Sequence, residues 1–498
     1  MDKKKNGFAS GLGFVLAAAG SAVGLGNLWG FPYKTQEYGG AAFVLVYIAC
    51  VLLIGAVTMV CEIFIGRRAQ ANPVTAFKNI HKNVGWFGVL AILIPGFIAC
   101  YYSVLGGYTV RFAANSFKGN DGTLEAFASN GLLVTVFTAI FIAMALFVVM
   151  AGVKAGIEKA SKVLMPALFV LLLGTAIFSL CLGEGVGEGL KFYLKPDFSK
   201  LGGTQILAAM GQAFYSLSLG MGAMIVYGSY TGKEISLVKS TGMICLFDTF
   251  VALLAGFAIF PALYHYKATA GVMPEDIAGS KLMFKTLPMV FESLGFVGKI
   301  VSFLFFAMVV IAALTSVISL LEVVCQFVIQ KFHVSRKKAV SILAVICFLI
   351  SVPVGISAGQ DMASPDAIKV FGMDLLSFFD TVTNTVLMPV CAFFSCITIG
   401  WLMGPKKAVA EMEQDGQTLG FFRPIFMFMV KFVTPLLILA IEVLGVFELI
   451  FPKGEAGRAF SANGLGITLS AYGLLAVGIV CYFLFFKKHS TGTNADEQ

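Results

Sequence analysis

Residues 20–32, with the sequence GSAVGLGNLWGFP, most constrain how this chain folds. They lie within an apolar segment long enough to cross a membrane, yet Gly20, Gly24 and Gly26 fall within seven residues. Each glycine costs roughly 1 kcal/mol relative to alanine inside a helix, so we expect the helix to open here. Opened backbone is tolerated at membrane depth only where it is buried in protein or lines a cavity. The stretch is therefore a candidate site.

A second interruption occurs at residues 216–222, SLSLGMG, again inside an apolar segment. Two glycine-interrupted segments in corresponding halves of a membrane chain are typical of the binding site of a secondary transporter. The alternative is that the glycines only permit tight helix packing. That alternative does not account for Asn27, a polar side chain inside the first interruption.

Composition places the chain in a bilayer. Of its 498 residues, 58% are hydrophobic and 12% are charged, and the mean hydropathy is +0.90, which a soluble core cannot absorb. The 10 cysteines lie mostly in apolar segments without CxxC or Cys/His pairing, so we interpret them as small buried hydrophobes. The net charge of +8 requires no nucleic-acid partner, and no organic cofactor is expected.

Twelve apolar runs are long enough to span a membrane, at roughly 20 residues each. They cover about 11–37, 41–66, 86–113, 132–152, 162–183, 204–230, 241–264, 297–330, 337–356, 371–403, 421–451 and 467–487. Loops are numbered by the run that they follow, so the even loops follow the second, fourth and later even runs. Most Lys and Arg residues fall in the N-terminus, the even loops and the C-terminus. Because loops rich in Lys and Arg stay in the cytoplasm, both termini are predicted to be cytoplasmic. A cleaved signal peptide at the N-terminus is an alternative, but its cleavage would cut the first interruption in two.

The motifs along the chain resemble one membrane family. In chain order they are GSAVGLGNLWGFPY from residue 20, GGAAF from 39, a Tyr-Tyr pair from 101, GQAFYSLSLGMGAMIVYGSY from 211, AALTS from 312 and FFDTVTN from 378. This order is similar to that of the neurotransmitter:sodium symporter family, and the short tails favour a bacterial amino-acid transporter.

The resemblance implies an all-α integral membrane protein with 12 transmembrane helices. Helices 1 and 6 would be broken, helices 1–10 would form a 5+5 inverted repeat, and two further helices would follow. The expected division is a cytoplasmic tail 1–10, a first repeat 11–183, an extracellular loop 184–203, a second repeat 204–403 with an extracellular loop 265–296, a cytoplasmic loop 404–420, helices 11 and 12 at 421–487, and a cytoplasmic tail 488–498. The plasma (inner) membrane is the expected location, and the oligomeric state stays open.

The first interruption offers ligands for two kinds of charge. Carbonyls at Gly20, Ala22 and Val23 and the carboxamide of Asn27 suit a hard cation, whereas free N–H groups near residues 25–26 suit a carboxylate. An amino acid with a sodium ion beside it meets both needs. By resemblance, a first sodium ion that also touches the substrate carboxylate would be bound by Ala22, Asn27, Ser216 and Asp248, and a second by Gly20, Val23, Ala312, Thr315 and Ser316.

Asp248 is an acid within the seventh apolar run, where the family has an asparagine ligand of the first sodium ion. A carboxylate inside the membrane is costly and is functional by default. Because a fixed carboxylate supplies the negative charge that chloride brings in chloride-dependent relatives, we expect chloride-independent transport, and Asp248 could exchange a proton on the return step. The alternative is a structural acid paired with a polar neighbour.

The resemblance also implies a substrate pocket. Its residues would be Ala22, Leu25, Gly26, Ile98, Tyr102, Tyr215, Ser216, Ser218, Met221, Ser316 and Leu320. Tyr102 would bond the substrate carboxylate, and Tyr215 would be an aromatic lid. Gly24 stands where monoamine carriers have Asp, which favours amino acids over amines. Met221 replaces a Phe and adapts to larger shapes, so we expect a bulky hydrophobic or aromatic L-amino acid.

The outer gate departs from the family pattern. The family pairs an Arg with an acid on helix 10, but here the Arg position is Gly30 while the acid, Asp380, is kept. Helical spacing puts Lys34 on the same face as Gly30, so Lys34 could reach Asp380. Alternatively, Lys34 is an interfacial lysine whose ammonium extends to the headgroups.

The inner gate departs as well. Its basic and aromatic residues correspond to Lys5 and Phe8, with Tyr230 kept and the acid replaced by Gln330. Glu322 lies about 10 Å from Thr315 along one helix face, so it would line the inward sodium exit or replace the lost acid. The alternative is a Glu322 bonded to a neighbouring helix.

Two further polar side chains are predicted to brace the broken helices. Glu62 resembles a buried family Glu that supports the unwound part of helix 6, and Gln212 would share that role.

The sequence thus predicts a sodium-coupled amino-acid symporter that is not an enzyme and whose partners are its substrate, sodium ions and the bilayer. A non-transporting amino-acid sensor or leak channel with the same site is the alternative. A membrane enzyme is disfavoured because the four histidines lie in loops or tails and offer no intramembrane ligand pair.

Overall fold

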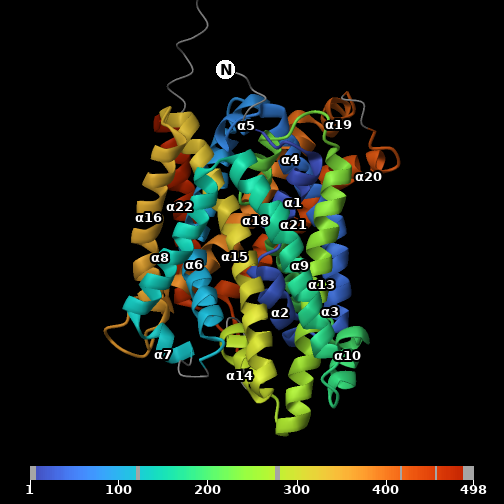
Figure 1. Ribbon diagram of the computed structural model, residues 1–498. Coiled ribbons are helices and arrows are strands. Elements are labelled where there is room, and N and C mark those ends of the chain that lie inside the picture. The colour runs from blue at the N-terminus through green and yellow to red at the C-terminus, as the bar shows by residue number, and fades with distance from the viewer. Residues whose placement is uncertain (1–6, 119–123, 275–280, 415–417, 455–456, 486–498) are drawn as a thin grey trace, which may run out of the picture.

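A computed structural model describes residues 7–118, 124–274, 281–414, 418–454 and 457–485. The described chain is almost entirely helical (Figure 1). Its only strands are two short antiparallel pairs, β1 (Lys369–Val370) with β2 (Met373–Asp374) and β3 (Lys453–Gly454) with β4 (Gly457–Arg458). The fold is therefore a helical bundle.

Ten of the described helical runs are long and apolar enough to cross a membrane. In chain order these are Ala41–Ala69, Gly85–Asn115, Gly131–Met150, Val153–Leu180, Leu237–Ala270, Gly295–Phe332, Arg336–Ala358, Leu375–Met403, Phe422–Ile450 and Ala462–Leu484. The bent pair Gly11–Ala22 and Gly26–Glu37 brings the count to eleven. The pair α11 (Gly203–Ser216) and α12 (Ala223–Ser229) stands outside this count, and twelve spans stay a prediction.

The helices of the first half are α1 (Gly11–Ala22), η2 (Gly26–Gly30), α2 (Phe31–Glu37), α3 (Ala41–Cys50), η3 (Val51–Gly55), α4 (Ala56–Ala69), α5 (Pro73–Ile80), α6 (Gly85–Asn115), α7 (Leu124–Ala128), α8 (Gly131–Met150), η4 (Val153–Glu158), α9 (Lys159–Leu180), α10 (Val186–Leu194) and η5 (Phe198–Lys200). Apart from η5, a 3₁₀ turn, the η elements here and below are π-helices.

After α11 and α12 follow α13 (Leu237–Ala270), η6 (Leu282–Thr286), α14 (Leu287–Ser293), α15 (Gly295–Phe332), α16 (Arg336–Ala358), α17 (Leu375–Asp380), η7 (Thr381–Leu387), α18 (Met388–Ile397), η8 (Thr398–Met403), α19 (Pro405–Glu413), α20 (Phe422–Phe428), η9 (Met429–Val433), α21 (Thr434–Ile450) and α22 (Ala462–Phe485). The predicted run 162–183 corresponds to Val153–Leu180, which begins nine residues earlier, and the predicted run 241–264 corresponds to Leu237–Ala270, which ends six residues later. Charged residues at those ends still continue the helix.

The chain leaves helical geometry in the first interruption. Val23 is extended at φ −68° and ψ 103°, and the two flanking helices meet at 52°. A Cβ on Gly24 would lie 2.6 Å from Oγ of Ser316 and 2.7 Å from the hydroxyl of Tyr102. Glycine at this position therefore lets α6 and α15 approach the opened backbone.

The second interruption, between α11 and α12, is tighter. Ser218, Gly220 and Gly222 have φ of 53°, 73° and 69°, a region that glycine enters without steric cost. A Cβ on Gly220 would lie 2.2 Å from the carbonyl oxygen of Met388, and one on Gly222 would lie 2.2 Å from that of Ala91. The turn is thus packed directly against the backbones of α18 and α6.

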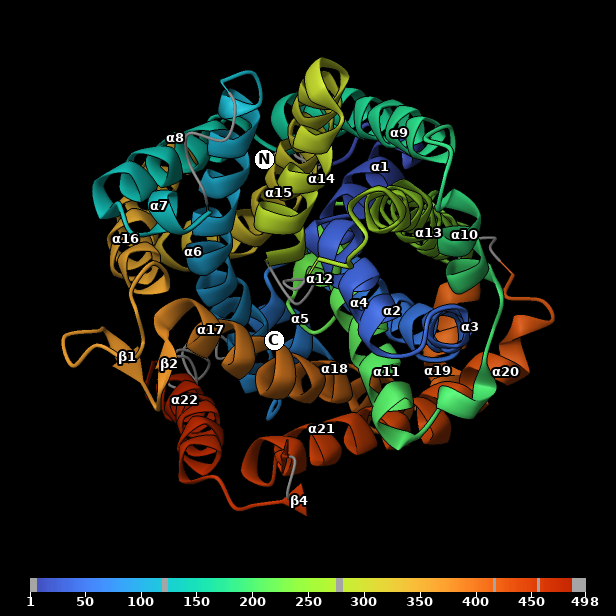
Figure 2. The same cartoon turned by 90° about the horizontal axis from the view of Figure 1, so that it is seen from below.

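The two interruptions lie inside the bundle. Seen from below, α12 lies near the middle of the molecule, whereas α21 and α22 lie along its rim (Figure 2). The elements α5 and α19, from predicted even loops, lie at the upper end in Figure 1, and α7, α10 and α14, from odd loops, lie at the lower end. The even and odd loops are thus on opposite ends of the helices.

Candidate functional site

A small cavity of about 20 Å³ lies where the two interruptions meet. It is lined by Ser21, Ala22, Gly24, Gly26, Ile98, Tyr102, Tyr215, Ser218, Met221, Ser316, Ser319 and Leu320. Nine of the eleven residues predicted for the substrate pocket are in this lining, and the other two, Leu25 and Ser216, lie beside it through the hydrogen bonds given below. The structure therefore brings together residues from four separate parts of the sequence.

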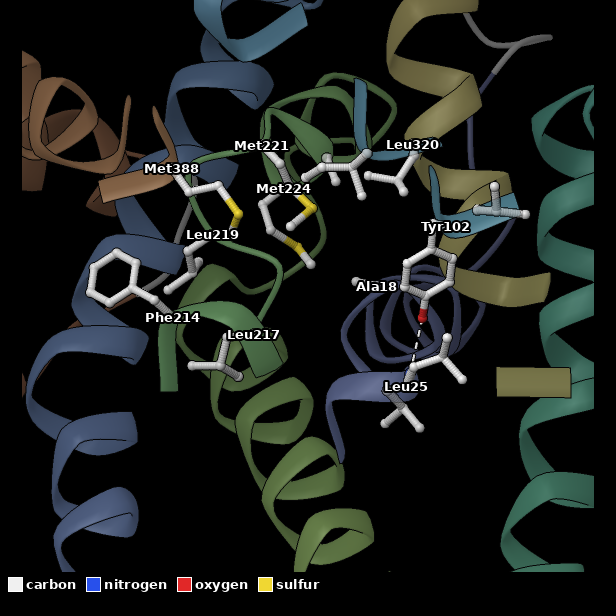
Figure 3. Close-up of a cluster of buried hydrophobic side chains, with 14 of the residues drawn as sticks. Ala18, Leu25, Tyr102, Phe214, Leu217, Leu219, Met221, Met224, Leu320 and Met388 are labelled. Carbon is white, nitrogen blue, oxygen red and sulfur yellow. Dashed lines mark hydrogen bonds between the residues drawn. The ribbon is translucent and has the colours of Figure 1, made fainter. Parts of the chain in front are cut away.

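Tyr102 on α6 closes one side of this cavity by holding the first interruption. Its hydroxyl oxygen accepts a hydrogen bond of 2.9 Å from the main-chain N–H of Leu25, and Figure 3 shows the ring pointing at that residue. Leu320 and Met221 line the same cavity and belong to the same buried cluster (Figure 3). The polar tip of Tyr102 thus meets the opened backbone, while apolar side chains surround the rest of the cavity.

Asp248 lies at the centre of a buried polar cluster beside the cavity. Nδ2 of Asn27 donates to Oδ1 of Asp248 over 2.8 Å, and the Ser216 hydroxyl donates to Oδ2 over 2.7 Å. The hydroxyl of Tyr47 lies 3.3 Å from the same Oδ2. All four side chains are fully buried, so the carboxyl group of Asp248 is surrounded by polar side chains and shielded from bulk solvent. Three of the four residues predicted for the first sodium ion are in direct contact here.

The residues predicted for the second sodium ion lie where α1 meets α15. A Cβ on Gly20 would lie 3.3 Å from Cβ of Thr315, and Oγ of Ser316 lies 3.4 Å from the carbonyl oxygen of Val23. The hydroxyl of Thr315 bonds the carbonyl of Ala312 over 3.1 Å. The five predicted residues are therefore neighbours across a single helix contact.

The carbonyl of Ser21 is a further acceptor at the first interruption. It receives hydrogen bonds from the hydroxyls of Ser218, over 2.8 Å, and Ser316, over 3.2 Å. The Ser21 hydroxyl in turn lies 2.6 Å from that of Ser319. Two serines that the sequence reasoning missed, Ser21 and Ser319, thus add hydroxyls to the cavity wall.

Tyr215 separates the small cavity from a larger one, which lies at the end predicted to be extracellular and is called the outer cavity. Its ring packs on Gly26, where an added Cβ would lie 2.7 Å from the ring carbons. Tyr215 also lines a cavity of about 450 Å³ together with Gly30, Lys34 and Asp380. This position matches that of a lid between an outer vestibule and a binding pocket.

Lys34 and Asp380 face the same outer cavity without forming an ion pair within 4 Å, as far as the described residues show. Asp380 instead accepts a hydrogen bond of 2.5 Å from Nδ2 of Asn384. Residues 26–30 form a π-helix, whose wider turn departs from the α-helical spacing used to place Lys34.

The opposite end of the site is closed by a second polar cluster. The Tyr230 hydroxyl donates to Oε1 of Glu322 over 2.6 Å, and the guanidinium of Arg336 on α16 pairs with the other carboxylate oxygen. The ring of Phe8 packs on Tyr230 with centroids 6.4 Å apart. Glu322 is thus bonded both to a neighbouring helix and to the predicted gate tyrosine. Lys5 lies outside the described residues.

The two predicted bracing residues both hold opened backbone. Oε1 of Glu62 accepts the N–H of Gly220 over 2.9 Å, and Nε2 of Gln212 donates to the carbonyl of Gly26 over 2.8 Å. Each fully buried side chain therefore supplies a partner that a regular helix would have supplied.

Comparison with known families gives this arrangement its context. The model of the sodium:neurotransmitter symporter family matches residues 5–124 and 122–489. The chain belongs to this family. It is accordingly a multi-pass membrane protein of a sodium-dependent transporter family, as the motifs predicted.

Relatives and solved structures agree with this assignment. The sodium-dependent transporter YhdH of Bacillus subtilis (strain 168) is 34% identical over 456 residues, covering 88% of this chain and 97% of that protein. A sodium-dependent transporter of Haemophilus influenzae (strain ATCC 51907 / DSM 11121 / KW20 / Rd) is 32% identical, covering 90% and 99%. The crystal structure of MhsT in complex with L-phenylalanine superimposes with a TM-score of 0.79 at 37% identity, covering 89% of this chain and 99% of that one.

Two residues of the site carried no usable signal in the sequence. Tyr47 has its hydroxyl 3.1 Å from that of Ser216, but a single tyrosine in an apolar run is ordinary. Arg336 begins α16 among other basic residues, and only the packing of α15 against α16 shows that it meets Glu322.

Proposed function

We propose that this protein is a sodium-coupled symporter that imports a neutral, hydrophobic or aromatic L-amino acid by alternating access and independently of chloride. It would work in the inner membrane with both termini cytoplasmic, on twelve spans arranged as a 5+5 inverted repeat with two further helices. The observation that carries the proposal is the contact of Asn27, Ser216 and Asp248 next to the cavity between the two interruptions.

The first sodium ion would sit among these three side chains and Ala22. In the structure Asn27 turns its amide nitrogen to Asp248 and its Oδ1 to the N–H of Gly24, 3.1 Å away. A half-turn of this amide presents Oδ1 to a cation, and sodium then replaces the N–H donors around the carboxylate of Asp248. Hard cations prefer such oxygen ligands. The second sodium ion would lie between Gly20, Val23 and the three α15 residues.

The amino acid would occupy the small cavity, whose walls must move apart on binding because about 20 Å³ is smaller than an amino acid. Its carboxylate would meet the N–H groups of Leu25 and Gly26 and the hydroxyl of Tyr102, which now accepts the Leu25 N–H. Its side chain would lie among Ile98, Met221 and Leu320, an apolar wall that favours a hydrophobic or aromatic substrate. The crystal structure of MhsT in complex with L-phenylalanine supports this class.

The binding of sodium and the binding of the amino acid would be coupled because the two ligands would lie side by side. A sodium ion beside the substrate carboxylate improves the amino-acid site, and by linkage the amino acid improves the sodium site by the same factor. Because Asp248 is a fixed buried anion, no chloride ion is needed to balance the first sodium ion.

Alternating access would use the two polar ends described above. Tyr215, Lys34 and Asp380 would act on the outer side, and Lys5, Tyr230 and Glu322 on the inner side. The end with the Tyr230 to Glu322 hydrogen bond would be the inner end, and the end with the larger cavity would be the outer end. Release inward would require this bond to open.

The proposal is tested by measuring amino-acid binding with and without sodium. Thermal unfolding of the purified protein is followed with each of the twenty amino acids in sodium chloride, in potassium chloride and in sodium gluconate. We expect stabilisation by one or a few hydrophobic or aromatic amino acids in both sodium salts but not in potassium chloride. Equal stabilisation in potassium would contradict the shared site, and a requirement for chloride would contradict the role of Asp248.

A further inference from the structure

A third cavity lies at the end of the molecule that is predicted to be extracellular, and it shares no lining residue with the two cavities described above. It has a volume of about 70 Å³ and lies where the ends of α6, α7, α14 and α15 adjoin. In Figure 1 this is the lower end, at α7 and α14. The polar part of its lining consists of Arg111, Asn115, Ser116, Glu292, Lys299 and Ser302. The proposed transport mechanism uses none of these residues.

Two cationic side chains in this lining have no acid partner. Within the described residues, neither Arg111 nor Lys299 has a carboxylate oxygen within 4 Å. The guanidinium of Arg111 lies over the ring of Phe127 instead, 5.6 Å from the ring centroid. Both cationic residues are half-buried, and a partly desolvated cation gains from an opposite charge. The cavity therefore favours an anion.

Glu292 sets the charge that this anion should carry. Its carboxylate lines the same cavity, and it has no basic side chain within 4 Å in the part of the chain that the structure describes. Two cations and one acid leave a single positive charge in excess. A phosphodiester carries one negative charge, whereas a phosphate with a single ester bond carries about −1.5 to −2 at pH 7. The lining thus matches a phosphodiester.

The cavity lies at the depth of lipid headgroups. With the middle of each spanning helix taken as the bilayer centre, Arg111 on α6 and Ser302 on α15 each lie about 17 Å from it, at 1.5 Å per residue. The hydrocarbon core ends about 15 Å from its centre. Both residues are therefore at the boundary between acyl chains and headgroups, where a phospholipid has its phosphate.

An exposed aromatic surface adjoins the cavity. Phe117 and Phe303 directly follow two of the lining serines, and their rings lie 5.5 Å apart. Their exposed fractions are 50% and 40%, and Phe296, three positions before Lys299, is 72% exposed. Aromatic side chains are enriched at membrane–water interfaces. This surface is where the acyl chains of a lipid with its phosphate in the cavity would lie.

We propose that the third cavity binds the phosphate of an anionic phospholipid, with Arg111 and Lys299 as its cationic partners. The head alcohol is uncharged, as in phosphatidylglycerol, because a cationic head would add positive charge beside two cations. Basic pockets between membrane helices bind lipid headgroups in this way. The lipid ties the outer ends of α6, α14 and α15 together, and its binding does not depend on which solute the protein carries.

The test measures lipid binding with a tryptophan beside the cavity. The chain has 3 tryptophans, so replacing Trp29, Trp86 and Trp401 by Phe and adding Phe303→Trp leaves one indole at the proposed site. A second protein carries Ile177→Trp instead. Ile177 is 53% exposed and lies about 16 Å from the middle of the span Val153–Leu180, so it reports the same depth at another place.

Each full-length protein is reconstituted in phosphatidylcholine without sodium or amino acids. Phosphatidylglycerol with brominated acyl chains, which quench a nearby indole, is then mixed in, and brominated diacylglycerol, which lacks the phosphate, is the matched lipid. At position 303 we expect phosphatidylglycerol to be preferred over diacylglycerol by about tenfold. At position 177 we expect a preference below about twofold, and an excess of inorganic phosphate should change neither value.

Four variants in the Phe303→Trp protein localise the site. Arg111→Gln and Lys299→Gln should each lower the preference about fivefold, since a basic residue near a headgroup contributes about 1 kcal/mol. Glu292→Gln should raise it by about twofold or more, because the variant removes a negative charge from the cavity. Lys267→Gln is the control: this lysine lies at the same end but already has Glu188 at 3.5 Å, so the preference should stay within about twofold.

The opposite signs separate lipid binding from a structural role, because a general loosening of the fold would not tighten binding in Glu292→Gln. Equal quenching by the two lipids at position 303, or the same preference at position 177, would overturn the proposal. So would an unaltered preference in both Arg111→Gln and Lys299→Gln, or a fall in Glu292→Gln. Displacement of the lipid by inorganic phosphate would mean a site for a free anion and would overturn the lipid assignment.

Discussion

Nδ2 of Asn27 lies 2.8 Å from Oδ1 of Asp248, which joins the first interrupted helix to the middle of α13. The sequence separates these residues by 221 positions, and the contact places a carboxylate where the chain opens its backbone. A fixed anion at this point gives a cation site its counter-charge. The first two predictions concern the immediate surroundings of this contact.

Replacing Asp248 by Asn is expected to raise the sodium concentration needed for half-maximal amino-acid binding by about tenfold or more. The variant keeps the size and the oxygen of the side chain but removes the negative charge that would balance the cation. Sodium titrations of amino-acid binding give the value. Ser216→Ala, which removes a neutral ligand from the same cluster, serves as the comparison and should have a smaller effect. An Asp248→Asn protein with unchanged sodium dependence would remove this residue from the ion site.

Replacing Gly24 by Ala is expected to weaken amino-acid binding by about tenfold or more. The new methyl group would lie 2.6 Å from Oγ of Ser316 and 2.7 Å from the Tyr102 hydroxyl, so both must move out of the cavity. Gly174→Ala in α9 is the matched control, since a Cβ there meets no atom within 4 Å. Equilibrium binding to both variants decides the point, and equal affinities would show that these hydroxyls do not contact the substrate.

Replacing Glu62 by Leu should destabilise the second interruption by about 1–3 kcal/mol, because the buried N–H of Gly220 loses its acceptor. Glu62→Gln keeps an oxygen in the same place and should lose much less. The apparent melting temperatures of the two purified variants measure the difference. Equal melting temperatures for the two variants would show that the hydrogen bond from Gly220 to Glu62 does not stabilise the protein.

Replacing Tyr230 by Phe is expected to loosen the inner end of the site. The lost hydrogen bond to Glu322 is one to a charged group, worth about 1.5–3 kcal/mol, so we expect the inner side to open about tenfold to a hundredfold more often. The alkylation rate of Cys325, buried on α15 one turn beyond Glu322, reports this opening when the other nine cysteines are replaced.

Tyr472→Phe provides the control for that experiment. Tyr472 donates a hydrogen bond of 2.7 Å to Glu442 between α22 and α21, which resembles the Tyr230 contact but lies elsewhere. Its replacement should leave the alkylation of Cys325 unchanged. Similar rates in both variants would mean that Tyr230 does not close the inner side.

Most residues of the candidate site could be predicted because they belong to short, local sequence motifs. Three glycines in one apolar run, Gly20, Gly24 and Gly26, predict an opened helix. The family motifs identify most of the residues that line the cavity. Glu62 was expected to brace the second interruption, and its hydrogen bond to Gly220 has that geometry.

Two features of the site could not be predicted from the sequence: the π-helix near Lys34 and the charge partner of Glu322. Residues 26–30 form a π-helix that no residue pattern predicted, and its spacing differs from the α-helical spacing used to place Lys34. Likewise, Arg336 meets Glu322 only because α16 packs on α15, so the charge partner of a predicted residue stayed hidden. α-Helical spacing does not describe a segment whose hydrogen bonds follow the π-helical pattern.

Uptake into proteoliposomes tests the central claim of sodium-coupled transport most directly. A radiolabelled amino acid identified by the binding screen is supplied outside under an inward sodium gradient against internal potassium, with chloride replaced by gluconate in a parallel set. The account predicts accumulation above the outside concentration that collapses when the sodium gradient is removed and is the same in gluconate. Binding without accumulation, or accumulation that needs chloride, would contradict it.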